Sequence, residues 1–540
     1  MRDDMPARRP QLAELGLFLL VVALPLVFTP FSLSPFGDGK LVMLTGGTLA
    51  LWASGLAVDR HLGVLGGILA TLVVISAFTG VDVMRGLTAQ TEGEGGGAIL
   101  MICCVVLAAI GPSVPDDLRE RARRWFVVSC SVVAVLGFSV RVFPDVAMAR
   151  FDLEFIGATL GNQLYAAGLL GAGIAAAIGA ARSRPLGRVV VVIALLSLGA
   201  ATFGERTSIV VPLIAAGATI WRSGIGRRTS AVLLASVVVP LLVWQLAGES
   251  ILPDTTGRGE AVGGFTQQAT DSQRFVVWDA MGRAALERPA LGWGPGSSQS
   301  AYLASARPED IDSATRTWAD AHDIVLETAV TSGIPAAVVL VMLLLLMAVR
   351  AIRGPPDRAW AFGAAAALGA FALVEPVGLV LTPLLFLFGG MACGRERAHQ
   401  QIETGPLVAA LTTSILSICL VGSLIMITGA TFERWGRAYG EAWALERALE
   451  VEPWRLSAAE RLALRLAVDG RAGDADAADR ARAVIGDAVL RHPWDVDVRL
   501  WAADVEALLR DDEAAAAAVR QHLERFPSDA QGVREATENP

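Results

Sequence analysis

Lysine is almost absent from this 540-residue sequence, which has Lys40 and otherwise uses arginine as its cationic side chain. We interpret this as a compositional bias of the genome, without functional meaning. The 5 cysteines all lie in apolar stretches, so the sequence predicts neither an exported disulfide framework nor a metal cluster. The net charge of -8 offers no overall basic balance that would indicate nucleic-acid binding. The sequence also lacks a Walker motif, a Rossmann fingerprint, zinc-ligand spacing and a serine–histidine elbow.

Apolar residues, in contrast, are abundant: they make up 54% of the chain, and the mean hydropathy is +0.52. These values are far above those of soluble globular proteins and indicate many membrane spans. We predict an all-α fold, a polytopic bundle of about thirteen transmembrane helices. The predicted apolar cores are 12–28, 41–58, 62–79, 98–111, 126–143, 164–181, 188–203, 208–221, 230–247, 334–349, 359–374, 377–393 and 407–428. The first core resembles a signal peptide, but no clear cleavage site follows it, so we interpret it as an uncleaved span.

The arginines between these cores predict an orientation. If the N-terminus is cytoplasmic, nearly every arginine cluster falls on the cytoplasmic side, as the positive-inside rule requires. The same topology places 80–97, 141–163, 204–207 and 248–323 outside, and an odd number of spans also places everything after Thr428 outside. We therefore predict a multi-pass protein of the bacterial plasma (inner) membrane. Its membrane domain covers 1–429 and includes a large extracytoplasmic loop, 248–323.

The last part of the chain has a different composition, rich in Ala, Leu, Arg, Glu and Asp at helical spacing. Three of its segments end in a similar way, at Pro453, Pro493 and Pro527. Helices closed by proline at intervals near 34 residues are typical of stacked tetratricopeptide-like hairpins. We predict an extracytoplasmic helical repeat domain over 430–530 and a disordered tail over 531–540, with a plain helical tail as the alternative.

The end of the long polar loop carries the strongest candidate for catalysis, His322. The other histidines are expected in cytoplasmic loops or on the surface of the C-terminal helices: His61, His399, His492 and His522. Asp320 and Asp323 flank His322. A neutral imidazole can take a proton from an attacking hydroxyl, and a neighbouring carboxylate can fix its tautomer. The alternative, of equal weight from the residues alone, is a histidine that caps the helix beginning near Ile324.

Two arginines are candidates for binding an anion. Arg206 lies in a hairpin so tight that its side chain must sit at bilayer depth or at the rim, where arginines usually face a cavity or an anionic partner. Arg274 opens an amphipathic stretch at the membrane boundary. Two guanidinium groups can bind a diphosphate and neutralise its charge without a metal ion. A salt bridge from Arg206 to Glu205, or contact with headgroups, is the structural alternative.

A glycine-rich turn between these residues is a weaker signal. Gly292 and Gly294 belong to a turn that can bring backbone amides close to a ligand, although turns of this composition are common. Glu375 lies in a tight outer turn, where we expect a structural role or a place in the wall of a cavity.

Several short motifs, taken in order, resemble the O-antigen ligase/polymerase-like superfamily of membrane glycosyltransferases. By topology the resemblance covers about 12–428, and by motif about 270–335. The motif residues are Thr159-Leu160-Gly161-Asn162, Arg206, Arg274, Trp278, Pro289, Gly292-Trp293-Gly294, His322, Leu326-Glu327 and Gly333-Ile334. The chain is most similar to the subgroup with C-terminal tetratricopeptide-like repeats. Two departures are present: Asp323 stands where the family usually has asparagine, and Gln163-Leu164 replace the usual proline-asparagine continuation.

This resemblance implies a GT-C-like helical membrane fold. It also implies transfer of a glycan from a polyprenyl-diphosphate carrier to an acceptor hydroxyl at the outer face of the plasma membrane. It implies that His322 lies near the acceptor and that Arg206 and Arg274 lie at the diphosphate, with Asp320, Asp323, Gly292 and Gly294 in support. No cofactor and no metal are expected. The expected partners are the lipid-linked donor, a glycan, lipid or protein acceptor, membrane lipids and a protein bound by the repeats.

Two other functions are compatible with parts of the sequence. A transporter or anion permease would use the arginines to bind its substrate within the membrane, but it predicts inverted repeats, and the two halves show no clear repeat. A membrane-anchored scaffold for surface-polysaccharide assembly would depend on the C-terminal repeats and would need no polar outer loop.

Overall fold

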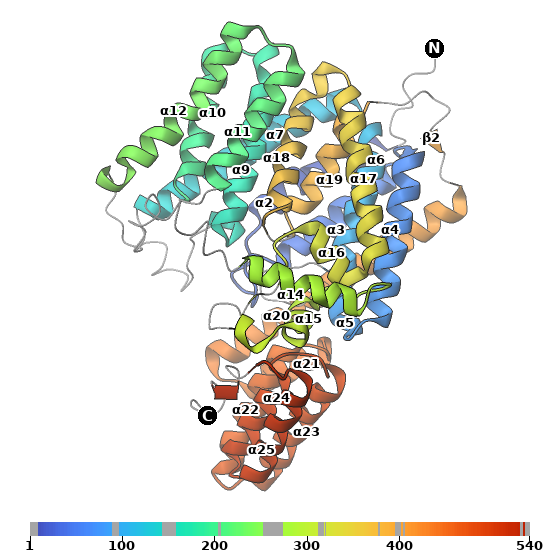
Figure 1. The fold of residues 1–540 in the computed structure, drawn as a ribbon, viewed down its shortest axis with the longest axis vertical. Helices are drawn as coiled ribbons and strands as arrows, with labels where there is room; N and C mark the ends of the chain where they lie inside the picture. The colour runs from blue at the N-terminus through green and yellow to red at the C-terminus, as the bar shows by residue number, and fades with distance from the viewer. Residues whose placement is uncertain are drawn as a thin grey trace.

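The computed structural model describes residues 9–88, 97–142, 158–203, 207–251, 274–311, 318, 320–375, 378–394, 401–402, 405–529 and 533–534. Within these residues the chain is helical, apart from one short antiparallel pair of strands, β1 (Val58–Asp59) and β2 (Gln401–Ile402). Figure 1 shows a broad bundle of long helices with a second, narrower stack of helices at one end, where the C-terminus also lies.

The helices of the bundle pack around one large apolar core. In its first half they are α1 (Pro10–Phe18), a π-helical turn (Leu19–Ala23), α2 (Leu24–Leu26), α3 (Asp38–Ala53), α4 (Arg60–Thr79), α6 (Ala98–Ile110), α7 (Asp116–Val142), α9 (Gln163–Gly179), α10 (Leu186–Ala201), α11 (Thr207–Ser223) and α12 (Arg227–Ile251). In its second half they are α17 (Ile334–Arg353), α18 (Ala359–Ala372), α19 (Leu381–Ala392) and the first part of α20 (Pro406–Tyr439). Single 3-10 turns lie at Gly111–Ser113, Ala158–Leu160, Ala180–Arg182 and Pro356–Arg358.

Each predicted apolar core coincides with one of these helical segments. Six helices in the described part of the chain are long and apolar enough to cross a membrane, and several shorter apolar helices accompany them. Their outward-facing residues include many exposed large apolar side chains, such as Leu246, Leu407 and Ile418, which a lipid environment would cover. The prediction of an all-α, polytopic integral membrane protein is therefore confirmed. The number of spans stays a prediction.

The loops at the two ends of the bundle form separate groups. At one end Arg350 pairs with Asp59 at 2.8 Å, and Arg222 donates to the carbonyl of Gly354. At the other end, Asp82 after α4 contacts His492 in the C-terminal helices. The predicted topology assigns these two groups of loops to opposite sides of the membrane, and this orientation stays a prediction.

Three short helices lie at the second end, beneath the bundle in Figure 1: α5 (Val83–Thr88), α14 (Arg274–Glu287) and α15 (Ser298–Ser305). A 3-10 turn (Pro308–Asp310) follows α15, and α16 (Ile324–Ser332) then leads directly into the span α17. Side chains from α14, α15, α16 and the C-terminal part of the chain form a second apolar cluster that includes Trp293, Tyr302 and Phe526.

The C-terminal stack consists of the end of α20 followed by α21 (Ala442–Val451), α22 (Leu456–Arg471), α23 (Ala475–Arg491), α24 (Val498–Leu508) and α25 (Asp512–Arg525). Helix α22 packs on α23, and α24 packs on α25, around a small core of alanine and aliphatic side chains. The expected boundary at 429/430 falls inside α20, which continues as one helix from the apolar segment into the charged one. Residues 535–540 of the predicted tail lie outside the described residues, and the tetratricopeptide reading stays a prediction.

Candidate functional site

Helix α14 connects two of the predicted site residues. Arg274 and Trp278 are four residues apart, so they lie on the same face of this helix. The indole Nε1 of Trp278 donates to the carbonyl of Ala321 at 2.8 Å, which holds residues 320–323, the His322 loop, against α14. The helix therefore places Arg274 about one turn away from the attachment point of the histidine.

The ring of His322 is fixed by two neighbours. Its Nδ1 lies 2.6 Å from Oδ1 of Asp320, and the ring lies 4.5 Å from that of Trp318, between centroids. A carboxylate at this position selects the tautomer with the proton on Nδ1, which leaves Nε2 as the basic nitrogen. The side chain keeps 20% of its surface exposed, so part of the held ring is open to a ligand.

The backbone of His322 is strained. Its φ is +50°, in the left-handed region, which residues other than glycine adopt at an energetic cost. Its own N–H donates to Oδ1 of Asp320 at 2.7 Å, so the same carboxylate holds both the backbone and the ring. Strain of this kind persists where the surroundings over-determine the conformation, and it is concentrated at functional sites.

The carboxylate of Glu327 holds the His322 loop through a backbone hydrogen bond. The sequence alone assigned no role to this residue. Its carboxylate accepts the backbone N–H of Ala321 at 2.9 Å and the hydroxyl of Ser298. Burial, with the nearby charge of Asp320, raises the pKa of the Glu327 carboxyl from its ordinary 4.5 to about 7. This buried carboxyl joins α15, α16 and the His322 loop.

The Glu327 carboxyl should make stability pH-dependent. Because its pKa is raised in the folded state, the contribution of this carboxyl to stability is full below pH 4.5, falls as the pH rises towards 7, and is lost above it. The full change corresponds to about 3 kcal/mol. In Glu327→Gln we expect this pH dependence to disappear when thermal unfolding of the detergent-solubilised protein is followed by tryptophan fluorescence. Ser298→Ala, which keeps the carboxyl, should retain it, and parallel curves for Glu327→Gln and the wild type would contradict the assignment.

Asp323 caps the helix that follows. Its Oδ1 accepts from the backbone N–H groups of Val325 and Leu326 at 2.8 and 2.7 Å, as an N-cap side chain does. The alternative in which His322 is the cap is therefore wrong. Asparagine and aspartate are about equally good N-caps, so the departure from the usual family residue preserves this function.

Arg274 is partnered in a way that the sequence did not reveal. Its NH1 donates to the carbonyl of Val374 at 2.8 Å, and its NH2 lies 3.3 Å from each oxygen of Glu375. These carboxylate contacts are longer than the 2.7–2.9 Å that is typical of charge-assisted hydrogen bonds. The guanidinium side chain is 35% exposed, whereas Glu375 is buried. Glu375 thus orients Arg274 at the end of α18 and leaves part of it accessible to an anion.

The glycine turn connects the site to the start of α17. The amides of Trp293 and Gly294 donate to the carbonyls of Val330 and Thr331 at 2.9 and 2.8 Å. Gly292 and Gly294 have φ of +69° and +105°. Because these amides bond to the end of α16, the turn holds that helix in position, which fits a supporting role better than direct contact of these amides with a ligand.

The C-terminal helices contact this turn through the loop between α23 and α24. The ring of Trp494 meets that of Trp293 edge to face at 5.6 Å, and the hydroxyl of Ser300 donates to the Trp494 carbonyl at 2.7 Å. Arg85 of α5 pairs with Asp495 at 2.8 Å. We call these contacts, with the pair formed by Asp82 and His492, the dock. It ties the C-terminal stack to the elements that carry the site.

Two histidines of the C-terminal helices are buried, so the prediction that they lie on the surface is wrong. His492 is 4% exposed, and its Nδ1 bonds to Asp82, whereas His522 is fully buried and bonds to Asp529 at 3.0 Å. Burial alone would raise the pKa of Asp82, but the hydrogen bond and charge of His492, with those of Arg85, lower it below the ordinary value. A carboxylate from a distant loop therefore holds the ring of His492, and a carboxylate from a nearby loop holds that of His522.

The other predicted residues lie elsewhere. Arg206 is outside the described residues, between the end of α10 and the start of α11. Asn162 is the N-cap of α9 and accepts from the N–H of Leu164 at 2.8 Å. Beside it, the buried Lys40 donates to the carbonyl of Thr159 at 2.5 Å, so the single lysine of the chain stabilises this turn.

Taken together, the fold and these contacts define an integral membrane protein with a polar site, built around a held histidine, at one end of its helical bundle. Residues 190–341 match the family model described as O-Antigen ligase, which confirms the resemblance to the O-antigen ligase/polymerase-like superfamily; the subgroup with C-terminal repeats stays a prediction. The matched segment is less than a third of the chain, but it contains His322, Arg274, Glu327 and the glycine turn. No curated protein matches the chain. The match supports a membrane glycosyltransferase-like ligase role.

Proposed function

We propose that the protein transfers a glycan from a polyprenyl-diphosphate carrier to an acceptor hydroxyl at the outer face of the bacterial plasma membrane. The observation that carries this proposal is the His322–Asp320 pair, in which a carboxylate holds an accessible imidazole inside the segment that matches the O-antigen ligase family. The cytoplasmic N-terminus and the extracytoplasmic C-terminal helices belong to this proposal, and the positive-inside distribution of arginine supports them.

The reaction is a single in-line displacement. Nε2 of His322 takes the proton of the acceptor hydroxyl as its oxygen attacks the anomeric carbon of the donor. The bond between this carbon and the diphosphate oxygen breaks, and the polyprenyl diphosphate leaves with the bonding electron pair. Asp320 stabilises the imidazolium that forms, and the configuration at the anomeric carbon inverts.

Arginine side chains stabilise the charge that develops on the leaving diphosphate. Arg274 is suited to this because its guanidinium, at the start of α14, is held by Val374 and Glu375 and stays partly exposed. We assign Arg206 to the same diphosphate from the family resemblance. Two planar guanidinium groups would each offer paired donors to phosphate oxygens.

The Arg274 assignment gives a direct test of the proposal. In vesicles reconstituted with lipid-diphosphate-linked glycan and acceptor, Arg274→Ala should lower the rate of transfer about 10²-fold, because one donor to the leaving group is lost. Arg274→Lys should recover part of the rate, since the charge is kept and the planar fork is lost. Release of free polyprenyl diphosphate and glycan attachment are measured together.

The matched control is Arg465→Ala, which removes an exposed arginine of α22 whose nearest carboxylate is 3.7 Å away. It should transfer at the wild-type rate. A wild-type protein that binds the lipid-linked donor but releases no polyprenyl diphosphate would refute the proposed function. Wild-type rates in Arg274→Ala would remove only this arginine from the mechanism.

A further inference from the structure

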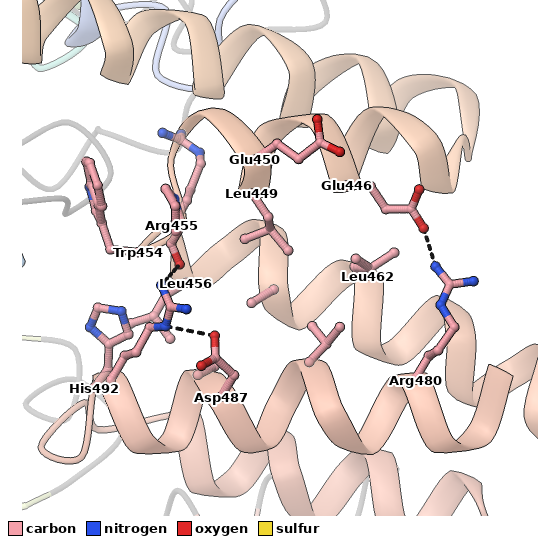
Figure 2. Close-up of a pocket in the computed structure, with 15 residues that line it drawn as sticks. Glu446, Leu449, Glu450, Trp454, Arg455, Leu456, Leu462, Arg480, Asp487 and His492 are labelled. Atoms are coloured by element: carbon pink, nitrogen blue, oxygen red, sulfur yellow. Dashed lines mark hydrogen bonds and ion pairs between the residues drawn. The ribbon is translucent and has the colours of Figure 1, made fainter. Parts of the chain in front are cut away.

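A groove in the C-terminal stack is not used by the proposed reaction. It has a volume of about 500 Å³ and lies between α21, α22 and α23. Its walls combine aliphatic side chains, such as Leu449 and Leu462, with charged ones. In Figure 2, Glu446 and Arg480 meet at one end of the groove, and Trp454 and His492 lie at the other. A volume of this size is in the range of pockets that bind small ligands.

Two polar nitrogen atoms in the lining are buried without a partner. Nδ1 of His492 is held by Asp82, but its Nε2, on the other side of the ring, has no hydrogen-bond partner among the described residues. Nε1 of Trp454 is likewise buried and unpaired within the part of the chain that the structure describes. Buried polar atoms normally have partners, so a ligand that offers both donors and acceptors would complete this end of the groove.

The charges of the groove favour a neutral ligand. Its lining holds equal numbers of carboxylates and guanidinium groups: Glu446, Glu450 and Asp487, and Arg455, Arg480 and Arg491. Several of these are already paired with each other or with the backbone, as Arg491 is with Asp487 at 2.7 Å. A strongly acidic or basic peptide would meet as many like charges as opposite ones. A hydroxyl group donates to a carboxylate and accepts from a guanidinium, so a polyhydroxylated ligand fits both.

The groove ends where the C-terminal stack meets the site. His492 lines the groove and is also part of the dock, and Trp494, two residues further on, packs on Trp293. Trp293 is in turn bonded to the end of α16, the helix that follows the His322 loop. The dock therefore joins the lining of the groove to the elements that carry the site.

We infer that this groove binds a saccharide chain, namely the part of the transferred or accepting glycan that lies several sugars away from the reacting one. The inference rests on the proposed function, because it takes the ligand to be the substrate of that reaction. An apolar sugar face can pack on the indole of Trp454, while its hydroxyls bond to Nε2 of His492 and to Asp487. The C-terminal stack would then select glycans by length.

The test uses the full-length protein in detergent and oligosaccharides released by mild acid from the carrier lipids of the producing strain. Binding is followed by isothermal titration calorimetry. We expect Trp454→Ala and Asp487→Asn each to weaken binding of long oligosaccharides by about tenfold, the loss that one or two hydrogen bonds and a stacking contact produce. Trp443→Ala, which removes a half-exposed tryptophan of α21 outside the groove, is the matched control and should bind as the wild type does.

Transfer assays separate this inference from the proposed function. Groove variants should raise the KM for long glycans and leave the rate with a single-repeat glycan unchanged. His322→Asn should bind long oligosaccharides normally and transfer them about 10²–10⁴-fold more slowly. Binding that is equal in Trp454→Ala, Asp487→Asn and the wild type would overturn the groove assignment and leave the reaction standing. A peptide that occupies the groove and is not displaced by oligosaccharides would also overturn it. Normal binding by a wild-type protein that cannot transfer would instead refute the reaction.

Discussion

Replacing His322 by asparagine should lower glycan transfer by about 10²–10⁴-fold, the usual contribution of a positioned general base. Asparagine is preferred to alanine here because it tolerates the left-handed backbone that this position adopts, with φ of +50°. The change therefore removes the basic nitrogen and keeps the loop. In cells, lipid-linked glycan should accumulate, and its amount is measured after extraction of the carrier lipids.

The matched control is His61→Asn, at the other end of the bundle, where the ring contacts Arg350. This variant should transfer at the wild-type rate. Thermal unfolding and the amount of protein in the membrane show whether each variant is folded. A well-expressed His322→Asn protein with unaltered transfer would exclude the histidine from the mechanism.

A bacterial strain that carries His322→Asn can distinguish a ligase from a polymerase. If the protein is a ligase, full-length glycan chains remain on the carrier and are missing from the cell surface. If it is a polymerase, single repeat units are transferred and the long chains are missing. The lengths of surface and carrier-linked glycans are compared by electrophoresis and mass spectrometry.

The helices of the bundle were predictable because each is specified locally. An apolar run long enough to cross a bilayer must bond its backbone internally, so it forms a helix wherever it lies. The starts of α14 and α16 were predictable too, at Arg274 and near Ile324, but the placement of these helices was not, because contacts that are distant in sequence hold them. Trp278 bonds to the carbonyl of Ala321, and this pairing leaves no trace in local periodicity.

The same distinction applies to the site. The order of motifs placed Arg274 and His322 together, and the structure attaches both to α14. Glu375 as the partner of Arg274 was not predictable, because the two are 101 positions apart. Pro493 was interpreted as the end of a repeat, yet the ring of the adjacent Trp494 packs on Trp293. Contacts such as Arg274–Glu375 and Trp293–Trp494 depend on how whole helices pack against each other. The residues next to each of these side chains in the sequence do not specify that packing.

The junction between α16 and α17 gives the largest expected effect on stability. Gly333 has φ of +87° and ψ of +161°, a conformation that is essentially restricted to glycine. A Cβ atom added here would lie 2.4 Å from the carbonyl oxygen of Ala290, a backbone atom that cannot rotate away. Ala290 is fixed in turn, because the neighbouring carbonyl of Pro289 accepts the N–H of Ile334 at 2.9 Å.

Gly333→Ala should therefore destabilise the protein by about 3 kcal/mol or more, since backbone strain and a backbone clash add. The substitution should also disturb the site, because α16 ends at this junction and its first turns hold Glu327 beside the His322 loop. We expect a lower unfolding temperature in detergent and less protein in the membrane. Gly282→Ala is the matched control: no atom lies within 4 Å of its added Cβ, and in the interior of α14 alanine should stabilise by about 0.5–1 kcal/mol. Equal unfolding temperatures for Gly333→Ala and the wild type would show that the junction can relax, and that the glycine is not what fixes α16 against α17.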